Sequence, residues 1–268
     1  MNRLLALACL SLVALPSYGM IIAQDDASQA AYNDGWQASD NGGFGFGAWN
    51  FLQTSGSSGT FIGNSGNNGS GTASPNINTG GRAWGIWANN SSLFSASRAV
   101  NTANPGDIVR ASLDMDNGFI DGGSITGNPF GVSGGVTLGG TVQGAMGVIF
   151  RGGQNGYDFF YGSTSTAVTY VSAGIGFTST GVEIDVVRNS ATSFTVNLKR
   201  LSDSSMASHT FMTPDNHVII GIGIQNTSAG TTSSRDAFFN NFEVEAVPEP
   251  GTILLGAGLA AMAARRRK

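Results

Sequence analysis

The sequence predicts an all-β protein, an antiparallel two-sheet β-sandwich of the jelly-roll type. Hydrophobic and polar residues alternate along several segments, which is the pattern of strands with one buried face. Turn-forming clusters such as residues 104–106 and 213–216 separate these segments at short intervals. Between residues 30 and 246 we find no amphipathic stripe long enough for a three-turn helix. Without helical crossovers, the strands must pair in antiparallel fashion and pack as two sheets.

The composition fits a folded, exported protein and excludes several other classes. Glycine occupies 40 of 268 positions, yet it shows no three-residue period and proline totals only 7, which excludes a collagen-like chain. Hydrophobic residues make up 41% of the chain, too many for a disordered protein. The net charge of −4 and a lysine content limited to Lys199 and Lys268 exclude a nucleic-acid-binding surface. The single cysteine, Cys9, lies in the N-terminal segment, so we expect a mature fold without disulfides.

The N-terminus has the layout of a secretory signal peptide, which we assign to residues 1–23. Arg3 supplies a positive charge, residues 4–15 are apolar, and small residues follow. The apolar run is shorter than the roughly 20 residues that a membrane-spanning helix needs. Cleavage after Gly19 and cleavage after Ala23 both fit the pattern, and the sequence does not choose between them.

The C-terminus, residues 247–268, combines three features in a fixed order. These are the tripeptide Pro248-Glu249-Pro250, an apolar stretch at residues 251–264, and the basic cluster Arg265-Arg266-Arg267-Lys268. The apolar stretch is predicted to be a short transmembrane segment, of marginal length for crossing a bilayer, and the basic cluster would hold its end on the cytoplasmic side. This arrangement resembles the PEP-CTERM sorting signal of Gram-negative bacteria.

The resemblance implies export, temporary retention in the inner membrane, and processing by an exosortase-type transpeptidase near the tripeptide. Proteins with this signal are associated with exopolysaccharide and biofilm production. The protein is therefore expected at the cell envelope, at the cell surface or outside the cell. The resemblance implies nothing about the chemistry of the rest of the chain.

Between the two ends, residues 24–246 are expected to form one Gly-rich domain. Alternating segments predict half-buried strands at residues 109–116, 182–186, 194–199 and 238–245. The apolar run at residues 217–224 predicts a central strand.

Two further expectations concern local detail. In the segment 238–245, Phe238, Phe242 and Val244 are expected to share the buried face. Residues 55–81 are rich in Gly, Ser and Asn and are expected to form a long surface loop. A calcium-binding β-roll is excluded because residues 41–80 contain no aspartate.

A cluster of oxygen-bearing side chains is the candidate metal site. Asp114 and Asp116 lie two residues apart and would share one strand face, Asn117 and Gly118 would turn the chain, and Asp121 would return to the same edge. Three carboxylates and an amide could hold calcium, the one cofactor that the sequence suggests. The alternative is a polar hairpin in which Asp116 and Asn117 bond to their own backbone.

Carboxylate pairs also raise the possibility of glycoside hydrolysis, which needs two such groups across a cleft. Asp114 with Asp116, and Glu183 with Asp185, are the pairs available, although this spacing is common on solvated strand faces. No catalytic residue is assigned. The two histidines, His209 and His217, are interpreted as solvated or core residues, because a zinc site would need further ligands from carboxylates alone.

Aromatic residues are the candidate carbohydrate-binding groups. Trp84 and Trp87 are three residues apart, so on a regular strand they face opposite sides and one of them is expected in the core. An exposed indole could stack on a sugar ring, while the alternative for both is simple packing.

Three segments, residues 81–89, 114–118 and 236–240, look like a concanavalin A-like lectin/glucanase sandwich. The resemblance could span most of residues 30–246, and it implies the same jelly-roll fold. No metal-site or catalytic motif of that family matches residue by residue, so no functional residue is transferred.

The favoured hypothesis is a non-catalytic exported module that associates with extracellular polysaccharide. One alternative is a glycoside hydrolase or lyase on the same sandwich, with Asp114, Asp116 or Asp121 as acid or base. Another is a structural matrix protein that self-associates through its sheet edges.

Overall fold

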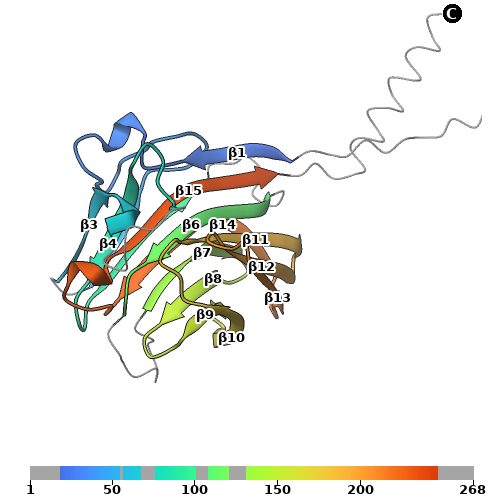
Figure 1. Cartoon of the computed structure of the whole chain (residues 1–268). Helices are drawn as coiled ribbons and strands as arrows, with labels where there is room; N and C mark the ends of the chain where they lie inside the picture. Colours follow the sequence, from blue (N-terminus) through green and yellow to red (C-terminus); the bar gives the residue numbers. More distant parts are fainter. Residues whose placement is uncertain (1–18, 55–56, 68–75, 101–107, 121–130, 247–268) are drawn as a thin grey trace, which may run out of the picture. The chain divides into compact units, whose positions relative to one another are not determined.

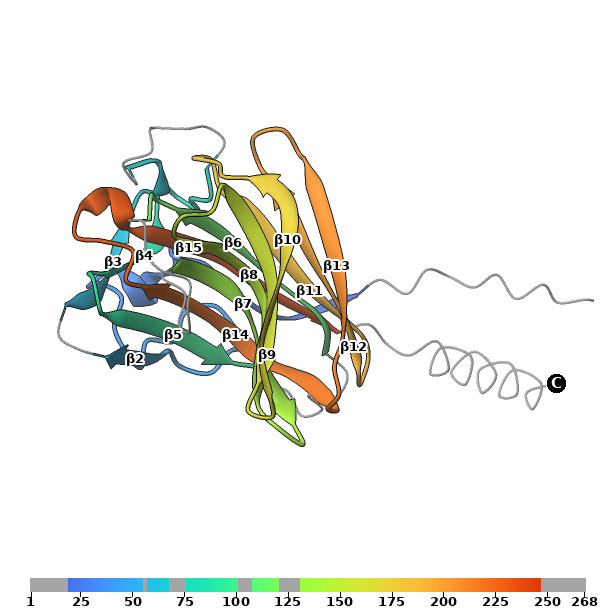
Figure 2. The ribbon, with the colours of Figure 1, turned by 90° about the horizontal axis from the view of Figure 1, so that it is seen from below.

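The computed structural model describes residues 19–54, 57–67, 76–100, 108–120 and 131–246. Within these residues, two antiparallel sheets pack face to face, which confirms the predicted sandwich (Figure 1, Figure 2). Residues 21–246 form one compact unit. The only helical elements in the described part of the chain are short 3-10 turns, namely η1 (Ala30–Tyr32), η2 (Ser65–Asn67) and η4 (Ser233–Arg235).

The eight-stranded sheet has the order β13-β12-β11-β6-β15-β4-β3, with β1 paired to β15 off this path. Its strands are β1 (Met20–Asp25), β3 (Ser58–Gly63), β4 (Ala83–Ala88), β6 (Ile108–Asn117), β11 (Val182–Ser190), β12 (Ser193–Arg200), β13 (Met206–Met212) and β15 (Ala237–Ala246). The predicted alternating strands all lie in this sheet.

The seven-stranded sheet has the order β10-β9-β8-β7-β14-β5-β2. Its strands are β2 (Asn50–Thr54), β5 (Leu93–Ala99), β7 (Gly131–Gly140), β8 (Gly144–Arg151), β9 (Gly156–Ser163), β10 (Thr166–Gly176) and β14 (His217–Thr227). The apolar run that predicted a central strand is β14, which lies between β7 and β5.

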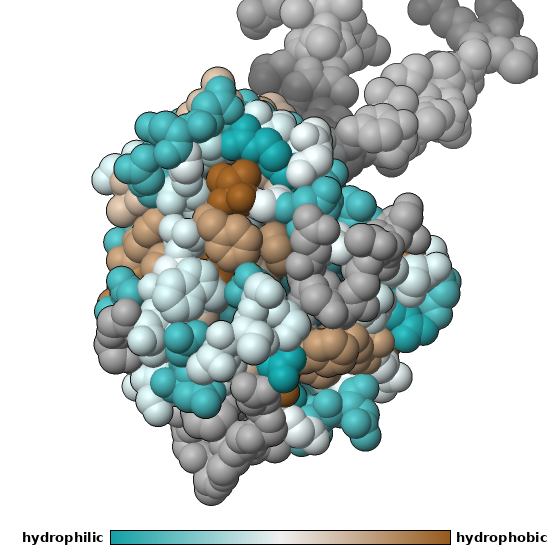
Figure 3. Space-filling model, turned by 60° about the vertical axis from the view of Figure 1, so that its left-hand side comes forward, coloured by the Kyte–Doolittle hydropathy of each residue, from teal (hydrophilic) through white to brown (hydrophobic). Residues whose placement is uncertain are grey.

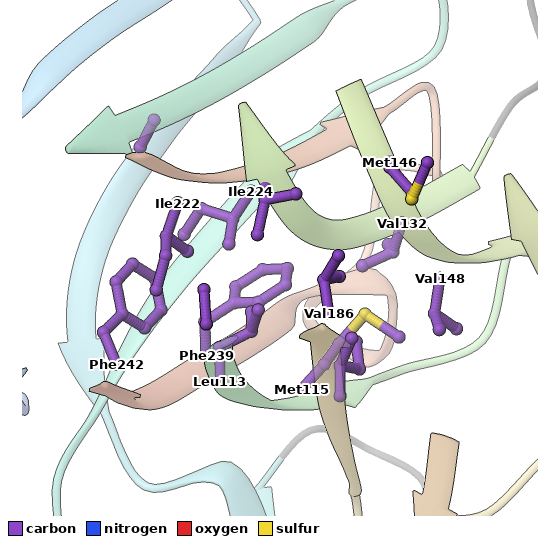
Figure 4. Packing of buried hydrophobic residues seen from close by; sticks show 14 of the residues in the cluster. Leu113, Met115, Val132, Met146, Val148, Val186, Ile222, Ile224, Phe239 and Phe242 are labelled. Carbon is purple, nitrogen blue, oxygen red and sulfur yellow. The ribbon is translucent and has the colours of Figure 1, made fainter. Parts of the chain in front are cut away.

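The hydrophobic core fills the space between the two sheets, because the strands turn alternate side chains toward the other sheet. Figure 4 shows this packing for residues of both sheets, including Leu113, Met115, Val186, Phe239 and Phe242 on one side and Val132, Met146, Val148, Ile222 and Ile224 on the other. At one end of the core, an aromatic cluster surrounds Trp84, whose ring centroid lies 5.0 Å from that of Phe242 and 5.1 Å from that of Trp49.

A β-bulge in β15 makes one prediction about buried faces wrong. Three steps along β15, from Asn240 to Glu243, correspond to two steps along β6, and Asn241 has a φ of 53°. The extra residue reverses the alternation. Phe239, Phe242 and Val244 therefore enter the main core, whereas Phe238 packs in a separate cluster with Ile77 and Ala83.

The prediction of a continuous surface loop at residues 55–81 is also wrong. Ser58–Gly63 form β3, the edge strand paired with β4. Farther along, Ile77 is almost completely buried beside Phe238. Polar composition hid both features, because an edge strand and a single anchoring side chain need few hydrophobic residues.

The N-terminal strand is fixed to the domain by a buried ion pair. The Asp25 carboxylate accepts hydrogen bonds from the Arg98 guanidinium and from the Tyr32 hydroxyl, and both charged side chains are fully buried. Trp49 Nε1 donates to the Tyr32 hydroxyl at 3.1 Å, which extends the network into the core. Figure 1 shows β1 and β15 running in opposite directions, so the start of β1 lies beside the end of β15.

Candidate functional site

The outer face of the seven-stranded sheet carries a groove of about 360 Å³. Strand register explains it. Ser97 of β5, Gly223 of β14, Gly135 of β7, Gly147 of β8, Phe160 of β9 and Tyr170 of β10 form one row across six strands. Side chains directly opposite one another in neighbouring strands share a face. Three successive glycines in this row leave the middle of the face without side chains, and we name the hollow the glycine groove.

At two of these positions, glycine is needed not only to keep the groove open but also because the neighbouring backbone leaves no room for a Cβ. A Cβ on Gly135 would lie 2.1 Å from the Met146 carbonyl oxygen, and a Cβ on Gly147 would lie 2.2 Å from that of Gly134. Gly223 differs, because a Cβ there would first meet Thr137 Cγ2 at 3.4 Å, an ordinary contact. A larger side chain could therefore replace Gly223 without a backbone clash, and it would project into the groove.

The walls of the glycine groove combine aromatic rings with uncharged polar groups. Phe160 and Tyr170, both half-buried, form one end, and hydroxyl and amide groups are contributed by Ser97, Ser133, Thr137 and Gln225. The described lining residues carry no formal charge. Beside the groove, the Arg151 guanidinium lies 4.3 Å from the centroid of the Tyr170 ring. The same guanidinium pairs with Asp158, so Arg151 is fixed and in turn helps to fix the position of the Tyr170 ring.

The two candidate tryptophans lie on opposite faces of β4, as their spacing predicted, and only one remains accessible. Trp84 is fully buried in the aromatic cluster, so the prediction that it stacks on a sugar is wrong for this residue. Trp87 is half-buried and, with Phe61, Asn89 and Asp236, lines an open hollow of about 420 Å³. Figure 3 turns forward the side of the molecule where β3 and β4 lie, and brown hydrophobic residues form small patches there among white and teal ones.

The outer face of the eight-stranded sheet carries most of the charge considered in the sequence analysis. Asp114 of β6 stands opposite Glu183 of β11, and both line an acidic pocket of about 290 Å³ with Glu243 and Asn241 of β15. Burial raises the pKa of Asp114 to about 7. A hydrogen bond of 2.6 Å from Asn241 Nδ2 lowers this pKa, but by less than burial raises it, and the nearby charge of Glu183 also raises it. The carboxylates that line this pocket together therefore come from different strands. Of the two predicted pairs, Asp114 and Asp116 are not brought together in the pocket, because Asp116 is fully buried, whereas Glu183 and Asp185 do share the outer face of β11.

The predicted calcium cluster is not assembled within the described residues. Asp114 lines the acidic pocket, but Asp116 is fully buried. Asn117 faces the other sheet, where its Oδ1 accepts a hydrogen bond of 3.0 Å from the Tyr157 hydroxyl. Asp121 lies outside the described residues. No group of three or more His, Cys, Asp or Glu side chains in the described part of the chain could hold a metal ion.

The chain does not turn back at Asn117 and Gly118, so the hairpin of the alternative is wrong there, although Asn117 Nδ2 does donate to the local backbone, to the Gly118 carbonyl at 3.0 Å. The Gly118 amide donates to the Asp236 carbonyl at 2.9 Å, and the Phe119 amide donates to the Ser234 carbonyl at 2.8 Å. The segment thus continues alongside the residues that precede β15. A Cβ on Gly118 would lie 2.2 Å from the Ser234 carbonyl oxygen, which explains the glycine by close approach of two backbones.

The histidines take structural positions among the described residues. His217 is buried, and its Nε2 lies 3.1 Å from the Tyr161 hydroxyl. His209 packs edge-on against Phe211, with 4.5 Å between the ring centroids.

Sequence reasoning missed the glycine groove because none of its residue types marks chemistry by itself. A signal was nevertheless present in β7, where Gly131, Ser133, Gly135, Thr137 and Gly139 occupy alternate positions. A strand face that lacks both charges and large side chains leaves room for a ligand. Only the register of the neighbouring strands shows that Gly147 and Gly223 continue the same row.

Residues 246–268 match the PEP-CTERM protein-sorting motif, which confirms the sorting signal expected at the C-terminus. The signal includes Pro248, Glu249 and Pro250 and the arginines Arg265, Arg266 and Arg267, which lie outside the described residues. It indicates export to the cell envelope or surface of a Gram-negative bacterium and processing by an exosortase-type enzyme. No helix in the described part of the chain is both long and apolar enough to span a membrane, and the predicted segment 251–264 lies outside that part. No curated protein matches the chain.

Several solved structures are similar to the chain at low sequence identity. A scytalido-glutamic peptidase has a TM-score of 0.31 and 18% identity, covering 51% of this chain and 59% of that one. The chain thus spans less than two thirds of the peptidase. A protein of unknown function from Shewanella oneidensis MR-1 has a TM-score of 0.48 and 16% identity over 92% of this chain and 97% of that one. A carbohydrate esterase from the Shiga toxin-encoding bacteriophage phi24B has a TM-score of 0.49 and 10% identity over 86% of this chain and all of that one.

Proposed function

We propose that the protein is a non-catalytic, exported module that binds extracellular polysaccharide in the glycine groove. The observation that carries this proposal is the row of three glycines bordered by Phe160 and Tyr170, in a groove whose described lining residues carry no charge. The sorting signal supports the location, because it directs the protein to the envelope or surface, where such polymers are found.

The lining suits a neutral sugar chain better than a charged ligand. The C–H face of a pyranose ring can pack on Phe160 or Tyr170, while its hydroxyls exchange hydrogen bonds with serine, threonine and glutamine side chains. A polyanion would need cations in the groove, and its described lining residues offer none. The volume of about 360 Å³ is within the usual range for ligand sites.

Binding can be tested with the exported, processed protein and exopolysaccharide from the producing organism. We expect co-sedimentation in buffer with calcium and equally in buffer with a chelator, because the groove contains no carboxylate among its described lining residues. The double substitution Phe160→Ala and Tyr170→Ala should weaken retention about tenfold, equivalent to about 1.4 kcal/mol.

The matched control is Trp87→Ala, which removes another half-buried aromatic side chain from the hollow on the other sheet. Retention that is lost with Trp87→Ala and kept in the Phe160/Tyr170 variant would move the site to that hollow. Retention that vanishes on chelation would favour a calcium-dependent site instead. No retention of the unmodified protein would refute polysaccharide binding.

A second candidate function is glycoside hydrolysis at the acidic pocket, which one observation favours. Asp114, with a pKa raised to about 7 by burial, lies opposite Glu183, so a carboxyl group that can donate a proton near neutral pH has a second carboxyl group across from it. If this is the activity, Asp114→Asn should abolish release of reducing sugar from the exopolysaccharide. Release that persists in Asp114→Asn would exclude this pocket.

A further inference from the structure

We propose that the signal peptide is removed by cleavage of the Gly19–Met20 bond, so that the mature chain begins with the complete strand β1. This assigns a processing site for the endopeptidase that removes signal peptides. It also moves the start of the mature domain from residue 24 to residue 20, which places Met20–Ala23 in the folded protein.

The residues before the bond fit what this class of peptidase requires. Small side chains are needed at the first and third positions before the cut. Cleavage after Gly19 has Gly19 and Ser17 at these positions. Cleavage after Ala23 has Ala23 but a large β-branched residue, Ile21, at the third position. Both bonds thus have a small residue directly before the cut, and they differ only at the third position, which by itself does not decide between them.

The structure adds that Ile21–Ala23 belong to the compact domain, with Met20 as the residue that precedes it at the start of β1. These residues form the first part of β1, which pairs with the central strand β15. Ala23 is fully buried in the main core, and Ile22 packs against that core. By contrast, Met20 is 64% exposed, so the domain boundary lies at the start of β1.

A neighbouring segment is shaped to receive β1. Gly43 and Gly45 have φ values of 65° and 75°, and a Cβ on either would lie 2.0 Å from a β1 carbonyl oxygen, that of Gln24 or of Ile22. Between them, Phe44 exchanges two backbone hydrogen bonds with Gln24, of 2.9 and 3.0 Å. The contact that excludes a side chain at Gly45 is made with the backbone of Ile22 and Ala23, so it exists only if these two residues remain in the mature protein.

Cleavage after Ala23 would leave the rest of the strand poorly supported. The new terminal ammonium would be on Gln24, directly before Asp25, whose carboxylate is buried with Arg98 and Tyr32. The chain would lose the buried Ala23 and part of the β1 backbone that pairs with β15. Loss of buried alanine and strand pairing destabilises a sandwich with no mature disulfide to compensate.

The test is N-terminal sequencing of the protein exported from a Gram-negative host that expresses the full chain. We expect a sequence that starts at Met20. A sequence that starts at Gln24, or at any other residue, would overturn the assignment. Because the measurement reads the terminus directly, it is independent of whether the protein binds polysaccharide.

A pair of substitutions inside the removed segment sharpens the test without touching the mature domain. Ser17→Phe places a large side chain at the third position before the proposed cut, so precursor should accumulate with its signal peptide attached. Tyr18→Phe, at the tolerant position between, should be processed normally. If Ser17→Phe is processed as well as Tyr18→Phe, the peptidase does not use the Gly19–Met20 bond, and the proposal fails.

Discussion

The two outer faces of the sandwich differ in how they meet water. The eight-stranded sheet covers its outer face with charged side chains that pair across strands, as Arg110 does with Asp185 and Glu245 at 2.9 and 3.1 Å. The seven-stranded sheet has serine, threonine and glycine at the centre of its outer face, with aromatic rings at one end. Cross-strand ion pairs fill a face, whereas glycines hollow it. The charged residues that stand out in the sequence therefore lie on one face, whereas the glycine groove lies on the other.

The largest effect should come from filling the glycine groove where the backbone forbids it. Gly135→Ala would put a Cβ 2.1 Å from the Met146 carbonyl oxygen, so strands β7 and β8 would have to separate. We expect a loss of about 2–3 kcal/mol in the free energy of unfolding, measured by urea denaturation of the exported protein. Gly223→Ala in the same row is the control and should change stability by less than about 0.5 kcal/mol. Equal losses in the two variants would contradict this account of the floor.

Filling the groove at its permissive position should separate binding from stability. Gly223→Val adds methyl groups where the nearest atom to a new Cβ is Thr137 Cγ2, at 3.4 Å, and valine is a good strand former. Retention on exopolysaccharide should fall about tenfold, equivalent to about 1.4 kcal/mol, with an unchanged unfolding midpoint. Undiminished retention in Gly223→Val would place the ligand elsewhere.

On the charged face, Asp114 should make stability depend on pH. Its pKa in the folded protein is about 7, above the unfolded value of 3.8, because burial disfavours the carboxylate. The folded state therefore binds the proton more tightly, and stability falls as the pH rises from about 4 to about 7. Asp114→Asn cannot ionise, so it should be more stable than the unmodified protein by on the order of 1 kcal/mol at pH 8 and equal to it at about pH 3.5.

Thermal denaturation at the two pH values measures this difference. Arg110→Gln, which changes a charge on the same face without removing Asp114, serves as the comparison. A stability gain in Asp114→Asn that is the same at both pH values would show that the carboxyl group does not titrate as described.

The smallest effect should come from the exposed ion pair on that face. Lys199 Nζ lies 2.9 Å from a Glu183 carboxylate oxygen, and the two side chains are 38% and 31% exposed. Lys199→Ala should cost about 0.5 kcal/mol or less, and the cost should shrink in about 0.5 M salt. A loss of several kcal/mol in urea denaturation would mean that this face contributes far more to stability than solvated pairs do.

Much of the fold could be predicted because alternation along a strand is a local property. Val182, Ile184 and Val186 are all fully buried, and the charged residues between them face outward, as their spacing of two requires. The face of Phe238 could not be predicted, because one extra residue at the bulge reverses the alternation and nothing in the spacing marks it.

The candidate site was less predictable, because it depends on which strands are neighbours. Asp114 meets Glu183 rather than Asp116, since strand register, and not distance along the chain, brings side chains together. The same holds for the glycine groove, where Ser97, Gly135 and Gly223 come from three separated segments. Trp84 and Trp87 were separable by spacing, but which one is buried depended on the orientation of β4.

The position of β15 has a mechanical consequence for any force applied at the C-terminal end of the domain. The strand that leads into the sorting tail ends at Ala246 and is paired with β6 on one side and with β4 and β1 on the other. A force directed along this strand is perpendicular to its hydrogen bonds, so the bonds share the load instead of opening one after another. Because β1 runs the other way alongside it, the first strand of the domain helps to secure the last (Figure 1). If a polymer binds to the opposite sheet as proposed, the part of its drag that acts along β15 would load these hydrogen bonds in shear.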